Sequence, residues 1–185
     1  SFSVGNAVKN GIPVAIVGKP NSGKSTLLNT LLMDDKAIVS DIPGTTRDSI
    51  EDTIAIDGME YRFIDTAGLR ETTDVIESMG IKKTIEKIEQ ASVILLIDEI
   101  SDSAELINQR IKAIREKINE TEKRLILLIN KVDTASPGQV NELSGKIQLE
   151  GNETILFISA KEKTGLGNLC NELSDAIIKD KINSD

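Results

Sequence analysis

A glycine-rich stretch, GKPNSGKST at Gly18–Thr26, directly follows the apolar run Val14–Val17. Its spacing is G-x-x-x-x-G-K-[ST], in which a strand leads through a loop into a helix. Glycines allow successive backbone N–H groups to converge on phosphate oxygens, and the helix N-terminus adds a favourable dipole. Lys24 is expected to reach the β- and γ-phosphates, and the Ser25 hydroxyl is expected to ligate Mg²⁺. The loop predicts a nucleoside triphosphate site, and its binding residues are Asn21, Ser22, Gly23, Lys24, Ser25 and Thr26.

This loop alone does not separate a kinase, an ATPase and a GTPase. The pattern of the remaining chain narrows the fold first. Short β-branched runs alternate with helical segments, which is typical of a mostly parallel sheet with crossover helices. Thr53–Ile56 and Tyr61–Ile64 flank Asp57-Gly58, which predicts a hairpin that adds one antiparallel edge strand. Four runs are too short for helices and too continuously apolar for exposed strands, so we expect central strands buried on both faces at Val14–Val17, Val93–Ile97, Leu125–Ile129 and Ile155–Ile158.

Helices are expected at Lys24–Met33, Ile76–Gln90, Ser103–Glu120, Gln139–Ile147 and Leu166–Lys179. The order of these elements and the hairpin resemble a Ras-like P-loop G domain. That is an α/β fold in which a mostly parallel six-stranded sheet has one antiparallel edge strand and helices on both faces. We expect this domain to occupy residues 12–180, with flanking tails at residues 1–11 and 181–185.

Composition excludes several classes of function. The net charge of −8 disfavours tight binding of nucleic acid by this chain alone, so a phosphate ligand needs a local site and metal ions. The chain has no histidine, which excludes imidazole catalysis and histidine-ligated zinc. Cys170 is the single cysteine, so no internal disulfide forms and a reducing, cytoplasmic location is expected. No apolar run approaches the roughly 18 residues that span a bilayer.

The motif NKVD, Asn130–Asp133, follows the apolar run Leu125–Ile129, at the edge where such sheets bind ligands. A carboxylate there can accept hydrogen bonds from N1–H and the exocyclic amine of guanine. Adenine lacks this pair of donors, and the unsatisfied charge would cost about 1–3 kcal/mol or more. SAK, Ser159–Lys161, supplies small residues beside the base, although it is a weak signal alone. The predicted base-binding residues are Asn130, Lys131, Asp133, Ser159, Ala160 and Lys161.

Two further motifs flank the predicted hairpin, DIPGTTRD at Asp41–Asp48 and DTAG at Asp65–Gly68. Together they offer a threonine hydroxyl for Mg²⁺, the Asp65 carboxylate for its outer coordination sphere, and the Gly68 N–H as a sensor of the γ-phosphate. Four motifs in this order predict a GTPase. They extend the predicted nucleotide-binding residues to Ser40, Asp41, Ile42, Pro43, Gly44, Thr45, Thr46, Asp65, Thr66, Ala67 and Gly68.

Leu69 follows Gly68, where Ras-like proteins often have a glutamine that orients the attacking water. A leucine cannot hold a water, so other groups must position it and offset the developing charge. An arginine finger in trans is worth about 10³–10⁵ in rate. The nearby candidates are Arg47, Arg70 and Glu77. Arginines at positions such as 47 and 70 are more often solvated surface residues than catalytic groups.

Three stretches, GKPNSGKS, DIPGTTRD and DTAGLRETTDVIESMGI, resemble the G domains of the MnmE (TrmE) family, GTPases of tRNA wobble-uridine modification within the TrmE-Era-EngA-like superfamily. The third is the most specific, because Leu69 through Glu77 to Gly80 separates this family from Der-type ribosome-assembly GTPases. The resemblance covers nearly the whole chain.

The resemblance implies G domains that pair face to face across their nucleotides, with K⁺ near the place of an arginine finger. It implies that Thr46 and Ser25 ligate Mg²⁺, and that Glu77 orients the attacking water through a bridging water. In the longer protein it implies MnmG (GidA) and tRNA as partners of an enzyme that binds GTP and GDP. The potassium ligands that it implies are Asn21, Ser40, Ile42 and Thr45.

The family also has a folate-binding domain, a helical domain and a C-terminal cysteine motif, which this sequence does not contain. We therefore expect an excised G domain, with residues 1–11 from the helical domain. Two alternatives remain open. A Der-type ribosome-assembly GTPase would be expected to have tandem G domains and a basic RNA-binding module. A nucleotide-dependent interaction switch would turn over slowly even in potassium at high protein concentration.

Overall fold

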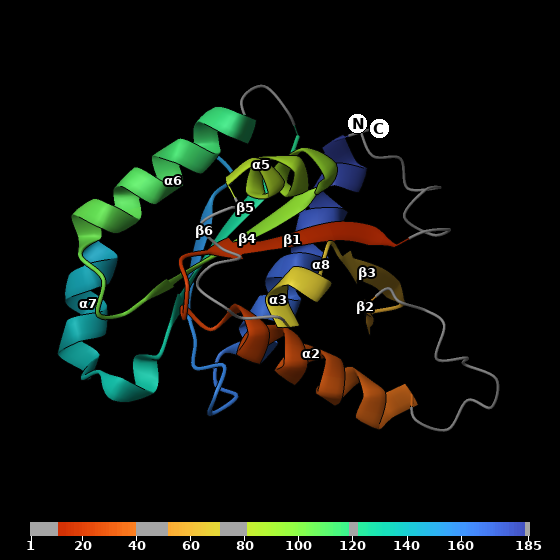
Figure 1. The fold of residues 1–185 in the computed structure, drawn as a ribbon, viewed down its shortest axis with the longest axis horizontal. Helices are drawn as coiled ribbons and strands as arrows, with labels where there is room; N and C mark the ends of the chain where they lie inside the picture. The colour runs from red at the N-terminus through yellow and green to blue at the C-terminus, as the bar shows by residue number, and fades with distance from the viewer. Residues whose placement is uncertain (1–10, 40–51, 71–80, 119–121, 184–185) are drawn as a thin grey trace.

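A computed structural model of the protein describes residues 11–39, 52–70, 81–118 and 122–183. Its centre is a six-stranded sheet of order β2-β3-β1-β4-β5-β6 (Figure 1). The strands are β1 (Ile12–Gly18), β2 (Asp52–Ile56), β3 (Met59–Phe63), β4 (Val93–Glu99), β5 (Arg124–Asn130) and β6 (Thr154–Phe157). Only β2 and β3 pair antiparallel in this sheet, which confirms the predicted fold.

The helices along the described chain are α2 (Lys24–Val39), the short α3 (Ala67–Arg70), α5 (Ile81–Gln90), α6 (Ala104–Ile118), α7 (Pro137–Lys146) and α8 (Leu166–Asn183), with a 3-10 turn, η1, at Val132–Thr134. Helix α2 continues beyond its predicted end at Met33, and α8 continues beyond Lys179, since neither extension contains a glycine or proline to stop it. The predicted first residues of α5, Ile76–Gly80, lie outside the described residues, as do Asn119 and Glu120 after α6.

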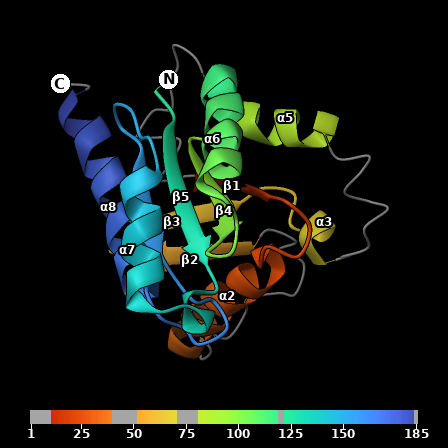
Figure 2. The same ribbon diagram turned by 90° about the vertical axis from the view of Figure 1, so that its left-hand side faces the viewer.

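Alternate residues of the strands face two separate cores, and Figure 2 shows helices on both sides of the sheet. In β5, Ile126 and Leu128 pack in a core with leucines of α2 and α8. Leu127 and Ile129 point the other way and pack with isoleucines of α6 and with Leu143 of α7. This period-2 alternation gives a three-layer sandwich.

One strand prediction is wrong. The run Ile155–Ile158 is not a central strand, because β6 lies at the edge of the sheet and pairs with β5 alone. All four β6 residues are half-buried, and Ile158 lies beyond the strand, where it is fully buried in the core with leucines of α2 and α8. Continuous apolarity also suits an edge strand whose two faces are covered by helices, so the run could not distinguish the two positions.

The carboxyl ends of β1, β4, β5 and β6 carry the segments that the sequence assigns to a nucleotide site. Parallel pairing brings those ends to one edge, with Glu99 of β4 opposite Asn130 of β5. Among the described helices, none is both long and apolar enough to cross a membrane.

Candidate nucleotide-binding site

The phosphate loop joins β1 to α2. Gly23 has a φ of 107°, a conformation that side chains disfavour, and the Leu27 N–H donates to its carbonyl at 2.9 Å as the helix begins. Lys24 is only 9% exposed, and its Nζ donates to the carbonyls of Gly18 at 2.6 Å and Lys19 at 3.1 Å. The ammonium group therefore lies directly over the loop that is predicted to bind phosphates.

Asn130 joins three of the predicted motifs. Its Nδ2 donates to the Ser22 carbonyl at 2.9 Å, and its Oδ1 accepts from the Ala160 N–H at 3.0 Å. Its side chain is 3% exposed, so both bonds are shielded from water. The phosphate loop, NKVD and SAK are thus held together by one amide side chain, although 108 residues separate Ser22 from Asn130.

The next residues of NKVD are fixed by contacts of their own. Lys131 has a left-handed φ of 67°, and its Nζ donates to the Asn21 carbonyl at 2.8 Å. Asp133 is exposed, and its Oδ1 accepts from the Ser159 hydroxyl at 2.8 Å. The Ser159 oxygen itself accepts from the Glu162 N–H at 3.1 Å. This chain of bonds sets the orientation of the carboxylate that is predicted to read guanine.

The DTAG motif lies where β3 leads into α3. Asp65 is exposed with a φ of 52°, whereas the Thr66 side chain is buried. Leu69 is 4% exposed and packs in the core with leucines of α2 and α8. Its carbonyl accepts a hydrogen bond from the Ser25 hydroxyl. The leucine side chain thus serves packing, while its backbone contacts the serine that is predicted to ligate Mg²⁺.

The other predicted residues fall into two groups. Thr26, Ala67 and Lys161 are exposed, and Gly68 lies in α3. The rest lie outside the described residues: Ser40, Asp41, Ile42, Pro43, Gly44, Thr45, Thr46, Arg47 and Glu77.

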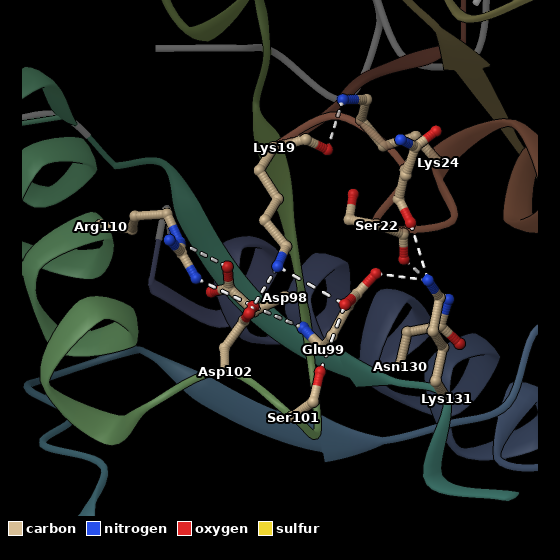
Figure 3. Close-up of polar contacts among 11 residues, drawn as sticks. Lys19, Ser22, Lys24, Asp98, Glu99, Ser101, Asp102, Arg110, Asn130 and Lys131 are labelled. Atoms are coloured by element: carbon tan, nitrogen blue, oxygen red, sulfur yellow. Dashed lines mark hydrogen bonds and ion pairs between the residues drawn. The ribbon is translucent and has the colours of Figure 1, made fainter. Parts of the chain in front are cut away.

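Sequence reasoning missed an ionic network at the end of β4, which Figure 3 shows beside the phosphate loop. Three carboxylates, of Asp98, Glu99 and Asp102, face three cationic side chains, of Lys19, Arg110 and Lys131. A signal was available, because Asp98 and Glu99 directly follow the buried run Val93–Ile97 and so had to emerge at the ligand edge of the sheet.

Charges in this network shift one another's ionisation. Burial lowers the pKa of Lys19, but the carboxylates of Asp102 and Glu99 outweigh it and raise the pKa. Burial alone would raise the pKa of Glu99. The hydrogen bond from Lys131 and the charge of Lys131 outweigh burial, so the pKa of Glu99 is lowered. Both groups therefore stay charged near neutral pH.

The pKa of Asp98 is raised rather than lowered, which predicts that the stability of the protein depends on pH. The Asp98 side chain is fully buried, and this burial raises its pKa to about 6. Arg110 Nε, which is 2.5 Å from Asp98 Oδ1, lowers the pKa but does not outweigh burial. The unfolded pKa is about 3.9. Between these values the folded state holds the proton more tightly, so the free energy of unfolding falls as pH rises, by up to about 3 kcal/mol.

Asp98→Asn removes this titration. We expect the free energy of unfolding of the wild type, relative to that variant, to decrease from pH 4 to pH 7.5, as measured by urea denaturation at each pH. The other carboxylates are common to both proteins, so their titrations largely cancel. A difference that stays constant or increases with pH would contradict the assignment.

A P-loop, a guanine-type base motif and a Ras-like sheet define a GTPase domain. A family model described as 50S ribosome-binding GTPase matches residues 13–131. The chain belongs to this family, whose members are GTP-hydrolysing enzymes.

Comparison with curated proteins confirms the resemblance drawn from the motifs. Proteins named tRNA modification GTPase MnmE are similar over most of this chain: one from Flavobacterium johnsoniae is 53% identical over 177 residues, 94% of this chain and 37% of that protein. Another, from Phocaeicola vulgatus, is 48% identical over 185 residues, 99% of this chain and 36% of that protein. The chain thus spans little more than a third of the length of these relatives.

Solved structures confirm the fold. A GTP-binding protein from Sulfolobus solfataricus in complex with GDP superposes with a TM-score of 0.60 at 21% identity, over 94% of this chain and 55% of that one. Translation elongation factor SelB from Methanococcus maripaludis also gives 0.60, at 17% identity, over 89% of this chain and 33% of that one.

Proposed function

We propose that this chain is the G domain of a tRNA modification GTPase, that residues 12–180 form the domain, and that K⁺ and dimerisation of G domains stimulate its hydrolysis of GTP. The observation that carries the first part is the 48–53% identity to proteins named tRNA modification GTPase MnmE. The cytoplasm, where tRNA is modified, is the proposed location.

Guanine recognition is assigned to Asp133. Its carboxylate would accept from the two guanine donors, and Ser159 keeps it in place through a 2.8 Å bond. The Ala160 N–H is already engaged by Asn130, so it acts by fixing the loop beside the base. A nucleotide without the donor pair would leave the carboxylate unsatisfied.

Phosphate binding is assigned to the loop and to Lys24. The ammonium now donates to the loop carbonyls of Gly18 and Lys19, and it needs only to turn toward phosphate oxygens, which are stronger acceptors because they are charged. The N-terminus of α2 faces the same loop and favours negative charge.

The donor set fits Mg²⁺. The Ser25 hydroxyl supplies a hard oxygen ligand, and because its proton is directed at the Leu69 carbonyl, the serine lone pairs remain available. The Asp65 carboxylate is assigned to the outer coordination sphere of the metal. Within the described ranges no group of three or more histidine, cysteine and acidic residues is arranged to hold a metal ion by itself, so phosphate oxygens would complete the coordination of Mg²⁺. Thr46 is proposed as a second protein ligand.

The proposed potassium ligands are the Asn21 side chain, the backbone carbonyls of Ser40 and Ile42, and Thr45. Asn21 is exposed at the rim of the loop, and because Lys131 engages its backbone carbonyl, its side-chain amide is the oxygen donor left for a cation. When bound, Mg²⁺ and K⁺ offset the charge that spreads over phosphate oxygens in a loose phosphoryl transfer.

Positioning of the attacking water is assigned to Glu77. The burial of Leu69 supports this assignment, because the side chain that follows Gly68 is apolar and packs in the core, so it cannot orient a water. In the longer protein, MnmG and tRNA are the proposed partners, and this acidic fragment is not expected to bind nucleic acid directly.

GTP turnover against protein concentration, in potassium and in sodium at equal ionic strength, tests the cation and the dimer together. An arginine finger is worth about 10³–10⁵ in rate, and a cation in its place would supply part of that effect, so we expect at least a roughly tenfold advantage of potassium. Turnover per molecule should rise with concentration as dimers form, and Asn21→Lys should abolish the potassium dependence. Equal rates in the two salts would refute the role of K⁺, and concentration-independent turnover would refute the dimer.

The family description leaves a ribosome-assembly role as the second candidate. It predicts that the chain co-sediments with ribosomal subunits in its GTP-bound state, which the leading proposal does not expect of this fragment. Slow turnover in potassium even at high concentration would instead favour an interaction switch.

A further inference from the structure

The Glu99 carboxylate lies between two lysines that belong to different halves of the nucleotide site (Figure 3). Its Oε1 accepts from Lys131 Nζ, in the base motif. Its Oε2 is 3.5 Å from Lys19 Nζ, in the phosphate loop. Asn130 and Lys131 each bond directly to the backbone of the phosphate loop, and the Glu99 carboxylate adds a link between side chains of the two motifs.

Each lysine also contacts a second group. Lys131 Nζ donates to the Asn21 carbonyl of the phosphate loop at 2.8 Å, and Lys19 Nζ lies 2.5 Å from Asp102 Oδ1. The Lys131 side chain is 43% exposed and that of Lys19 is 33% exposed. Without a fixed anion, side chains this exposed would spread over many rotamers in water.

Glu99 is well placed to be that fixed anion. Its side chain is only 13% exposed, and its backbone is anchored on both sides. Its N–H donates to Asp102 Oδ2 at 3.0 Å, and as the last residue of β4 it pairs with Asn130 of β5. The carboxylate therefore starts from the same strand pair that carries the base motif.

We propose that Glu99 is a positioning residue for the nucleotide: it holds Lys131 over the phosphate loop and Lys19 beside it, and so couples the phosphate half of the site to the base half. This inference rests on guanine nucleotide binding as proposed above. Glu99 does not itself touch the nucleotide, and it acts through the two lysines.

The sign of one measurement separates this role from a simple effect of charge. A carboxylate near bound phosphates repels them, so neutralising it should tighten nucleotide binding if charge were its only effect. Loss of positioning has the opposite consequence, because Lys131 would leave the Asn21 carbonyl for solvent and the loop would open more readily. The two effects cannot give the same change in dissociation rate.

The test is the dissociation rate of a fluorescent GDP analogue, chased with excess GDP, from wild-type protein and from Glu99→Gln. This isosteric change removes the charge and keeps the shape. We expect dissociation to become about 5–10-fold faster, the range for one charged hydrogen bond that is partly exposed. In a Lys131→Met background, the same substitution should change the rate by less than about twofold, since its main partner is gone.

Glu142→Gln is the matched control. It removes a carboxylate that pairs with Lys146 at 3.0 Å on the exposed face of α7, and its dissociation rate should equal that of the wild type. An unchanged or slower rate in Glu99→Gln would overturn the proposal, and so would equal acceleration in both backgrounds, which indicates general loosening. Wild-type protein that fails to hold GDP would instead contradict the proposed function.

Discussion

Gly23→Ala is expected to lower guanine nucleotide affinity by more than 100-fold. A Cβ at this position would lie 2.1 Å from Nδ2 of Asn130, far inside van der Waals contact. The φ of 107° adds strain of about 1–2 kcal/mol for any residue with a side chain. The Asn130 amide would have to move, and with it the bonds to Ser22 and Ala160, each worth about 0.5–1.5 kcal/mol. The sum, about 3 kcal/mol or more, corresponds to over two orders of magnitude in affinity.

Isothermal titration with GDP, together with urea denaturation, measures this effect and shows whether the variant is folded. Gly145→Ala is the matched control, because a Cβ there meets nothing within 4 Å and the residue lies in α7. That change should leave affinity unchanged and raise the free energy of unfolding by about 0.5–1 kcal/mol. Near-normal affinity in Gly23→Ala would show that the contact with Asn130 does not shape the site.

Glu77→Ala is expected to reduce GTP turnover by about 10²–10⁴-fold while GTP affinity changes by less than about threefold. The reason is that a group which acts on the attacking water contributes in the transition state and little in the ground state. Single-turnover hydrolysis in potassium gives the rate, and equilibrium binding of a slowly hydrolysed GTP analogue gives the affinity.

Glu86→Ala provides a comparison, because Glu86 is an exposed acidic residue of α5, close to Glu77 in the sequence. It should retain wild-type turnover and affinity. A large loss of binding in Glu77→Ala, with turnover restored at saturating GTP, would show that the residue is structural and that another group positions the water.

The strands and the phosphate loop could be predicted because their signals are local. Continuous apolar runs predicted β1, β4 and β5, and Asp57-Gly58 predicted the turn between β2 and β3. Sheet order is not local, and this is why the run that became β6 was wrongly assigned to the centre of the sheet. The short α3 was also missed, since four residues that include Gly68 give no helical periodicity.

The site was predictable motif by motif but not as a connected structure. The letters NKVD indicate a base-binding carboxylate, yet they do not reveal that Asn130 is engaged by Ser22 and Ala160. The bond between Lys19 and Asp102 joins residues 83 positions apart, and the charged residues involved could equally have been solvated. Such contacts depend on which strand ends become neighbours, so they follow only once the sheet order is known.

The strict alternation of β5 between two cores has a genetic consequence. Deleting or inserting one residue within Arg124–Asn130 would move the side chains that follow the change from one core to the other and turn the Asn130 amide away from Ser22. Length changes in this strand should therefore be far more damaging than substitutions among Ile, Leu and Val. Viable indels in this domain are expected to fall in its connecting loops.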